Sequence, residues 1–236
     1  MTLRHTLTVL ILLLCAGLAQ AQGGSFRWHA GHAIADSTVR RLGTDYCFAA
    51  IPIDDATFSR MQGRSYKAGA RIQRSELRYL RLLHVTLDGR TLMGEMVCNR
   101  ALAADLVEIF HELYRQHYPI ERMVLIDEYD ADDERSMAAN NTSCFNYRLV
   151  SGTTSLSAHA RGCAVDLNPF YNPYVHTRNG RQLIEPRGSE RYANRAASFS
   201  YKIDRTDLAY RLFTAHGFTW GGAWRTMKDY QHFEKR

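Results

Sequence analysis

The chain has 236 residues, of which 45% are hydrophobic and 23% are charged, and its formal net charge is +6. This composition excludes disordered, collagen-like and coiled-coil proteins, and the length allows one substantial domain. A domain of this size buries most of the surface of its unfolded chain, so it needs no metal ion or disulfide merely to stay folded. A metal site in this chain would therefore indicate chemistry.

The first 21 residues have the pattern of a secretory signal peptide. Arg4 supplies a positive charge, an apolar run follows from Leu7 to Leu14, and Ala19 and Ala21 form a small-x-small cleavage pattern. The apolar run is shorter than the roughly 20 residues that a transmembrane helix needs. We therefore expect cleavage after Ala21, export to the periplasm or the extracellular space, and no membrane anchor after cleavage.

Four cysteines follow the expected cleavage site, and they are Cys47, Cys98, Cys144 and Cys163. An even number of cysteines in an exported protein predicts one or two disulfides, and three complete pairings are open. The sequence contains no Cys-x-x-Cys pair, which disfavours a cysteine zinc site. Export also makes an anionic surface a better partner for the positive charge than nucleic acid, and solubility alone explains the charge equally well.

The first half of the chain predicts one clear helix. Residues 22–45 have the pattern of an irregular or partly helical lead-in. Asn99–Gln116 can form a helix that Asn99 caps and that ends before Pro119. Its apolar residues fall on one face, and they are Leu102, Leu106, Ile109, Phe110 and Leu113. A short strand at Met123–Ile126 and a solvated acidic loop at 127–143 are expected next.

The second half predicts strands, one long insertion and a second helix. Alternation of apolar and polar residues predicts strands at Phe145–Leu149 and Cys163–Leu167. Residues 171–200 have the composition of a mostly irregular insertion, and Thr206–His216 predicts a helix that Gly217 ends. Closing strands are expected at 218–224 and 230–233. Helices beside short strands, without a repeated strand-helix-strand order, predict an α+β domain with a small antiparallel sheet flanked by helices.

Two polar segments carry candidate metal ligands. Residues 157–167 contain His159 and Asp166, and the segment near the C-terminus contains Asp229 and His232. Two imidazoles and one carboxylate suit zinc, and a catalytic zinc keeps a further position open for water. Asp229 remains as a spare carboxylate three residues before His232. Each segment alone is a weak indication, and their combination favours a metal site.

The local pattern around these residues is compatible with a shared site. Gly162 permits a sharp turn between His159 and the following strand. On that strand, Asp166 shares a face with the small side chain of Ala164, whereas Cys163 lies on the opposite face and is excluded as a ligand. Asp229 and His232 have opposite parity in an ideal strand, so the hypothesis requires a bend between them.

Together the two segments resemble the zinc D-alanyl-D-alanine carboxypeptidase-like peptidases, the VanY-type family that also contains endolysin L-alanyl-D-glutamate peptidases. The family pattern is Ser-x-His-x-x-Gly-x-Ala-x-Asp, followed far downstream by Glu/Asp-x-x-His. The matching positions are Ser157, His159, Gly162, Ala164, Asp166, Asp229 and His232. The resemblance extends to residues 136–143, 145–148, 168–174 and 220–224.

The resemblance implies a role for each matching residue. His159, Asp166 and His232 would bind Zn²⁺, and Asp229 would act as the general base that takes a proton from water and returns it to the leaving amine. Arg148 matches the arginine that stabilises the oxyanion in this family. Ser157 would support the metal loop or bind substrate by hydrogen bonding.

The resemblance also implies how the chain is divided and what it acts on. A signal peptide at 1–21 would precede a lead-in at 22–89, packed on a catalytic core at 90–236. The expected partners are peptidoglycan stem peptides, with no nucleic acid, and the expected state is a monomer. Asp229 favours an L-Ala-D-Glu endopeptidase, because the carboxypeptidase branch usually carries Glu there.

Two alternatives stay open. One is a D-Ala-D-Ala carboxypeptidase, and the other is a non-catalytic wall-binding module of the same fold. The spare carboxylate of Asp229 argues against the second, because a purely structural zinc site needs no base.

Overall fold

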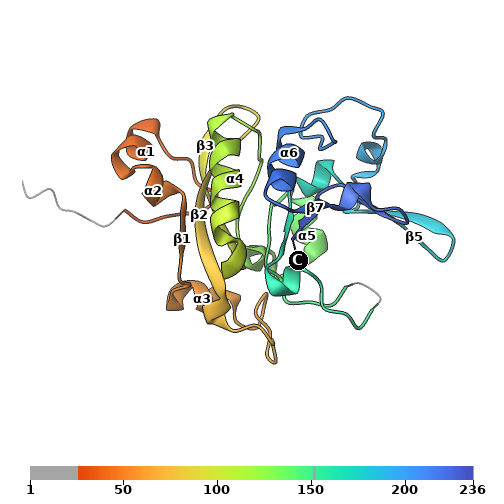
Figure 1. The fold of residues 1–236 in the computed structure, drawn as a ribbon, viewed down its shortest axis with the longest axis horizontal. Helices are drawn as coiled ribbons and strands as arrows, with labels where there is room; N and C mark the ends of the chain where they lie inside the picture. Colours follow the sequence, from red (N-terminus) through yellow and green to blue (C-terminus); the bar gives the residue numbers. More distant parts are fainter. Residues whose placement is uncertain (1–25, 151–152, 236) are drawn as a thin grey trace, which may run out of the picture.

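Short strands form three antiparallel sheets of three strands each in the computed structural model, which describes residues 26–150 and 153–235 (Figure 1). The expected signal peptide at 1–21 lies outside these residues. In the first sheet, in the order β1-β2-β3, the strands are β1 (Ala49–Ile51), β2 (Leu77–Val85) and β3 (Thr91–Asn99). In the second they are β4 (Ala164–Asp166), β9 (His232–Glu234) and β7 (Thr219–Trp220). In the third they are β6 (Arg181–Glu185), β5 (Tyr174–Arg178) and β8 (Lys228–Asp229).

Helices and sheets together make an α+β domain, as the sequence predicts. The described helices are α1 (Asp36–Leu42), α2 (Thr44–Cys47), α3 (Asp55–Met61), α4 (Ala103–Arg115), α5 (Asp133–Ala138) and α6 (Leu208–Ala215). None of the helices in the described ranges is long and apolar enough to cross a bilayer. The pairing of β2 with β3 runs from Leu77↔Asn99 to Val85↔Thr91, so the two strands form one hairpin that residues 86–90 connect.

Helix α4 confirms the helix predicted at Asn99–Gln116, with one change in its first turn. Residues Arg100–Leu102 form a 3₁₀ turn, and the Asn99 side chain accepts a hydrogen bond of 3.0 Å from the amide of Ala101. This is the capping contact that an Asn at this position supplies. The predicted apolar face is buried against β2 (Figure 1).

Helix α6 confirms the second predicted helix and connects it to the C-terminal sheet. The Asp207 carboxylate caps its first turn by accepting from the amide of Ala209 at 2.8 Å. On its buried face, Phe213 stacks on Phe233 of β9 with ring centroids 4.4 Å apart. The helix is therefore packed directly against the strand that carries His232.

Three sequence-based expectations for the central segment are wrong. Residues Met123–Ile126 form no strand, because Met123 is buried with one hydrogen bond from the Glu95 amide and Ile126 begins a 3₁₀ turn, η3 (Ile126–Tyr129). The acidic segment 127–143 is not all loop, since it contains α5. Residues Phe145–Leu149 form no strand, because Asn146 is buried and donates to the backbone of Ala131 and to Asp133.

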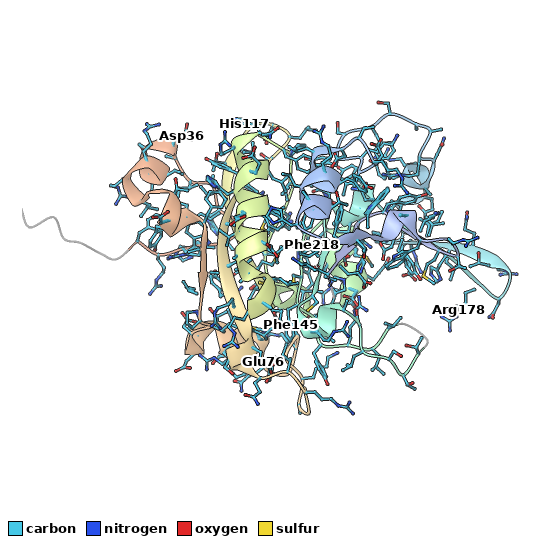
Figure 2. The ribbon with its side chains drawn as sticks, in the orientation of Figure 1. Asp36, Glu76, His117, Phe145, Arg178 and Phe218 are labelled. Carbon is cyan, nitrogen blue, oxygen red and sulfur yellow. The ribbon has the colours of Figure 1, made fainter. Side chains whose placement is uncertain are left out.

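The expected irregular insertion at 171–200 instead contains the β5–β6 hairpin. Asn179 and Gly180 at its turn both have positive φ, 52° and 74°. An Asn-Gly pair favours such a turn, so this pair could have indicated the hairpin from the sequence. Figure 2 shows Arg178 near its tip, away from the body of the protein.

The four cysteines of the described chain are free thiols, so neither of the expected disulfides is present. Cys47, Cys98 and Cys144 are buried, and Cys163 is half-buried. Burial raises the pKa of the Cys98 and Cys144 thiols. Buried neutral thiols behave as small apolar side chains in a core.

Gly162 offers a test of how the candidate metal loop is held. Its φ is +66°, and a Cβ at this position would lie 2.6 Å from the backbone nitrogen of Asn99. We expect Gly162→Ala to lower the free energy of unfolding by about 3 kcal/mol and Tm by about 6–12 °C. Calorimetry on the purified protein measures this.

Gly180→Ala is the matched control. Gly180 also has positive φ, but no atom lies within 4 Å of a Cβ built there. The substitution should therefore lower the free energy of unfolding only by the backbone conformational cost, about 1 kcal/mol. Equal destabilisation by the two substitutions would contradict the close packing of Gly162 on the end of β3.

Candidate metal centre

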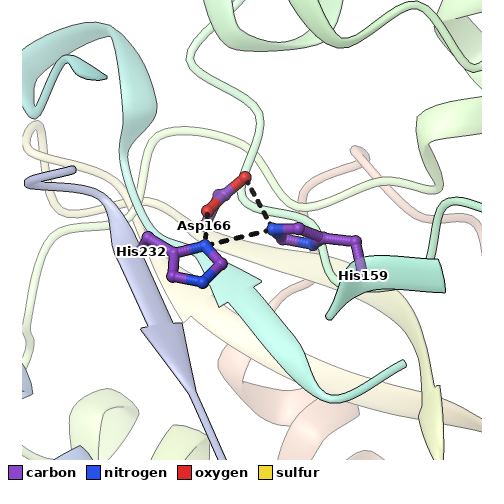
Figure 3. Close-up of side chains that lie close together, drawn as sticks. All are labelled: His159, Asp166 and His232. Atoms are coloured by element: carbon purple, nitrogen blue, oxygen red, sulfur yellow. Dashed lines mark hydrogen bonds and ion pairs between the residues drawn. The ribbon is translucent and has the colours of Figure 1, made fainter. Parts of the chain in front are cut away.

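Asp166 and His232 are direct cross-strand partners. They lie opposite each other where β4 pairs with β9. Side chains of directly opposed residues project from the same face of a sheet. The Oδ1 atom of Asp166 lies 3.1 Å from Nδ1 of His232 (Figure 3). The antiparallel register thus joins the two polar segments, which are 66 residues apart in the sequence.

His159 reaches the same point from a 3₁₀ turn, η4 (His159–Arg161), which Gly162 ends in the left-handed conformation. Its Nδ1 lies 2.6 Å from the carbonyl oxygen of Cys144, so this nitrogen donates a hydrogen bond. The Nε2 atom, on the other side of the ring, faces the other two residues. It lies 3.2 Å from Asp166 Oδ2 and 3.2 Å from His232 Nδ1 (Figure 3).

The three donor atoms have the spacing that a tetrahedral metal site requires. Zinc bound to nitrogen and oxygen at 2.0–2.1 Å has neighbouring ligand atoms about 3.3 Å apart in a tetrahedron. The observed separations of 3.1–3.2 Å are close to this value. His159, Asp166 and His232 therefore fit a divalent metal ion, and Cys163 is not part of this group.

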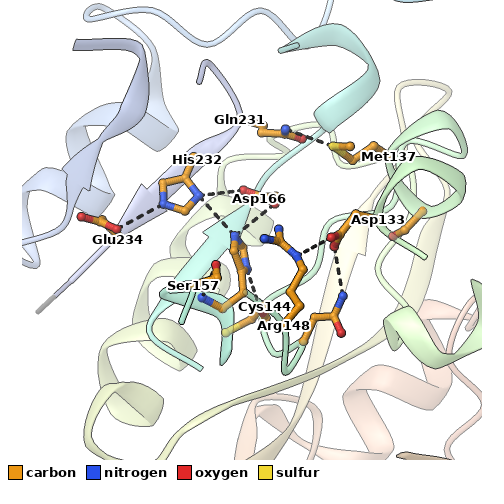
Figure 4. A network of polar contacts seen from close by, with 12 residues as sticks. Asp133, Met137, Cys144, Arg148, Ser157, Asp166, Gln231, His232 and Glu234 are labelled. Carbon is orange, nitrogen blue, oxygen red and sulfur yellow. Dashed lines mark hydrogen bonds and ion pairs between the residues drawn. The ribbon is translucent and has the colours of Figure 1, made fainter. Parts of the chain in front are cut away.

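Further contacts fix the orientation of the two histidine rings. Glu234 Oε2 lies 3.5 Å from Nε2 of His232, on the side of the ring away from Asp166. Trp224 packs beside the same imidazole, with ring centroids 5.3 Å apart. A carboxylate or carbonyl on the second nitrogen of a metal-binding histidine fixes the ring and its tautomer. Both histidines have such a partner here (Figure 4).

The electrostatics of the group favour a bound cation. Burial would raise the pKa of Asp166, but the two histidines outweigh it and hold that pKa well below its usual range. Burial would lower the pKa of His232, but its hydrogen bonds to Asp166 and Glu234 raise the pKa to about 10. In the absence of metal, a proton on His232 therefore supplies the positive charge that Asp166 requires.

Asp229 lies beside the group because the chain bends as the hypothesis requires. Asp229 belongs to β8, which pairs with β5, whereas His232 belongs to β9 in another sheet. The change of sheet occurs at residues 230–231. Gly221 lies against both residues, since a Cβ there would be 2.8 Å from Cβ of Asp229 and 3.2 Å from Cβ of His232.

The Asp229 carboxyl group has an unusual environment. Its Oδ1 atom is buried and has no hydrogen-bond partner among the described residues. Burial, together with repulsion from Asp166, raises the pKa of Asp229 to about 7, while the two histidines oppose this shift. A carboxyl group with a pKa near neutrality can both accept and return a proton.

Arg148 and Ser157 are linked through the backbone at the edge of the site. The Ser157 amide donates to the Arg148 carbonyl oxygen at 3.1 Å. The Arg148 guanidinium forms an ion pair with Asp133, at the start of α5 (Figure 4). The buried Ser157 hydroxyl accepts from the His159 amide at 3.2 Å, which supports the metal loop.

Two neighbours of the site have roles that the sequence did not predict. Asp133 orients Arg148 and Asn146, and no motif marks it within the acidic segment. Gly221 allows Asp229 and His232 to approach, and the Gly221-Gly222 pair was the available signal. The adjacent Trp220 is buried in the core, and its indole N–H donates a hydrogen bond to the Tyr230 carbonyl oxygen.

An open pocket of about 700 Å³ lies next to the group. Trp224 and Glu234, which both contact His232, form part of its wall. Trp224 and Glu234 therefore connect the pocket to His232. The aromatic side chains of the pocket offer an apolar surface.

Comparison with known families agrees with this geometry. Residues 151–235 match the family model described as D-alanyl-D-alanine carboxypeptidase. The segment that carries the candidate ligands is similar to this family. The resemblance inferred from the motifs is thereby confirmed over these residues, and it supports a metallopeptidase.

The matched segment contains His159, Asp166, Asp229 and His232, whereas Arg148 lies before it. No curated protein and no solved structure matches the chain.

The raised pKa of Asp229 gives a pH-dependent test in the metal-free protein. Because the folded-state pKa lies above the ordinary value of 3.8, stability associated with the protonated group is present at low pH and is lost as pH rises through about 7. We expect Asp229→Asn, which stays neutral, to raise Tm at pH 8 by about 5 °C and to change it by less than about 2 °C at pH 5.

Thermal unfolding of both proteins in chelator at the two pH values measures this difference. An equal shift at pH 5 and pH 8 would show that the Asp229 carboxylate is not destabilised by its surroundings.

Proposed function

We propose that the protein is an exported zinc peptidase that hydrolyses peptide bonds in peptidoglycan stem peptides. The observation that carries the proposal is the convergence of His159, Asp166 and His232, with the carboxyl group of Asp229 beside them. The match of residues 151–235 to D-alanyl-D-alanine carboxypeptidases supports the class of substrate. The signal-peptide pattern at 1–21 supports export.

The metal ligands and Asp229 divide the chemistry between them. Zinc held by His159, Asp166 and His232 would supply Lewis acidity and lower the pKa of a water molecule at its open position. Asp229 accepts the proton from the attacking water and donates it to the leaving amine. A bound cation would lower the pKa of the Asp229 carboxyl group, which would then be ionised and able to act as a base at neutral pH.

Arg148 is proposed to stabilise the negative charge that develops on the carbonyl oxygen of the scissile bond. Its ion pair with Asp133 and the backbone link to Ser157 hold it at the edge of the site. A fixed cation that meets charge formed only in the transition state accelerates the reaction. Ser157 acts through the metal loop, since its hydroxyl accepts from the His159 amide.

Two scissile bonds remain as candidates. The shorter side chain of Asp229 favours an L-Ala-D-Glu endopeptidase, as its resemblance to that branch implies. The description of the matched family favours the alternative, a D-Ala-D-Ala carboxypeptidase. The buried, unpartnered oxygen of Asp229 supports a catalytic protein over a wall-binding module, because burying such a group without a function is unfavourable.

Asp229→Ala tests the assigned base. We expect the variant to bind zinc as the wild type does and to lose activity by a factor of about 10³, within the range for general acid–base catalysis. Zinc content is measured by mass spectrometry of the metal. Activity is measured on defined muropeptides, with and without chelator.

The products of the same assay identify the bond that is cut. Cleavage after L-alanine supports the endopeptidase, and release of D-alanine supports the carboxypeptidase.

Full activity in Asp229→Ala would contradict the mechanism. A wild-type protein that binds zinc but cuts no stem peptide would contradict the proposed substrate.

A further inference from the structure

A second cavity, of about 1020 Å³, lies on the N-terminal sheet. It is bounded by residues 26–32, by the β1–β3 sheet, by α3 and by residues 122–129. None of the candidate metal ligands lines it. It also lies outside the segment that matches the carboxypeptidase family.

Two charged residues face this cavity from the sheet. Arg81 of β2 and Glu95 of β3 are direct cross-strand partners, so their side chains leave the same face. Tyr79, two residues before Arg81, lies on that face as well. All three side chains line the cavity.

The Glu95 carboxylate bonds to Arg60 and Tyr79 and forms no hydrogen bond with Arg81. Arg60 binds both oxygens of Glu95, at 2.5 and 2.9 Å. The Tyr79 hydroxyl donates to the same carboxylate at 2.9 Å. Glu95 is buried, and this bidentate pair with a further donor compensates its charge.

Arg81 is held by aromatic rings instead. Its guanidinium lies 3.7 Å from the ring centroid of Tyr46 and 6.0 Å from that of Trp28. Both rings are themselves anchored, since Trp28 donates to the Gly94 carbonyl at 3.0 Å and Tyr46 to the Phe26 carbonyl at 3.1 Å. These cation–π contacts position the guanidinium at the wall of the cavity.

The Nε–H group of Arg81 has no acceptor in the described part of the chain, although this nitrogen is buried. A buried donor without an acceptor is destabilising, and more so when it carries charge. A guanidinium is planar and can donate two parallel hydrogen bonds, so it suits a planar anion with two oxygens.

We propose that this cavity binds the carboxylate of an organic ligand, with Arg81 as the anchoring residue. The carboxylate would accept two hydrogen bonds from the guanidinium edge, as Arg60 already does for Glu95 in the same cavity. The aromatic residues around Arg81 would contact the apolar part of the ligand. A peptide carboxylate and a sugar acid both have this chemistry. The inference is independent of the proposed peptidase activity.

Binding is tested by NMR titration of the full-length protein, following the Nε–H resonance of Arg81. The probes are N-acetylalanine and glucuronate, with N-acetylalaninamide and methyl glucuronate as matched uncharged ligands. We expect at least one free acid to shift the resonance with a Kd of about 1 mM or tighter, and its uncharged counterpart to cause no shift. The acid that binds distinguishes a peptide ligand from a sugar ligand.

Three variants complete the test, with binding followed by calorimetry. Arg81→Lys keeps the charge but loses the two-pronged geometry, so we expect at least tenfold weaker binding. Arg81→Met should abolish binding, whereas Arg115→Met, which removes an exposed arginine of α4 outside the cavity, should leave it unchanged. The proposal would be overturned if neither acid bound, or if the acids and the uncharged ligands bound equally. It would also be overturned if a folded Arg81→Lys or Arg81→Met variant bound the acid with unchanged affinity.

Discussion

The pairing of β4 with β9 is the constraint on which the candidate metal centre depends. Asp166 and His232 are adjacent only in this register, and a slip by one residue would turn the two side chains to opposite faces. The neighbouring pair holds the register, because Val165 and Phe233 are fully buried on the other face. Phe233 in turn stacks on Phe213 of α6. Apolar packing on one face of the ladder thus positions the polar group on the other.

The same arrangement explains why the site favours a cation. Two imidazoles and a carboxylate converge within 3.2 Å in a largely buried place. Buried charges are unfavourable unless they are paired or bind metal. In the metal-free protein, a protonated His232 pairs with Asp166, and the hydrogen bonds from His232 to Asp166 and Glu234 outweigh burial and raise its pKa. A divalent ion bound by the same atoms would replace that proton, so metal affinity should rise with pH.

The sequence predicted the parts of the fold that depend on local pattern. The apolar face of α4 and the alternation in 163–167 each have a clear periodicity, and Asn99 is a recognisable cap before the helix. The β2–β3 hairpin was missed, because both strands are buried on nearly every residue and show little alternation. The strand expected at 145–149 failed because Asn146 is buried in a polar network that only tertiary contacts create.

The candidate site was predicted from two short motifs, and the structure brought His159, Asp166 and His232 together as that prediction required. The motifs did not indicate which other side chains and backbone groups surround these residues. Asp133, Gly221 and the Cys144 carbonyl all influence the site through contacts between distant segments. Such contacts follow from the packing of the whole domain, and no local pattern encodes them.

X-ray absorption spectroscopy of the zinc-loaded protein tests the central claim most directly, because it reports the atoms bound to the metal. We expect nitrogen and oxygen ligands at about 2.0–2.1 Å, with more distant scattering from two imidazoles. Sulfur at about 2.3 Å, or an absence of imidazole scattering, would contradict the assignment of His159, Asp166 and His232 as the ligands.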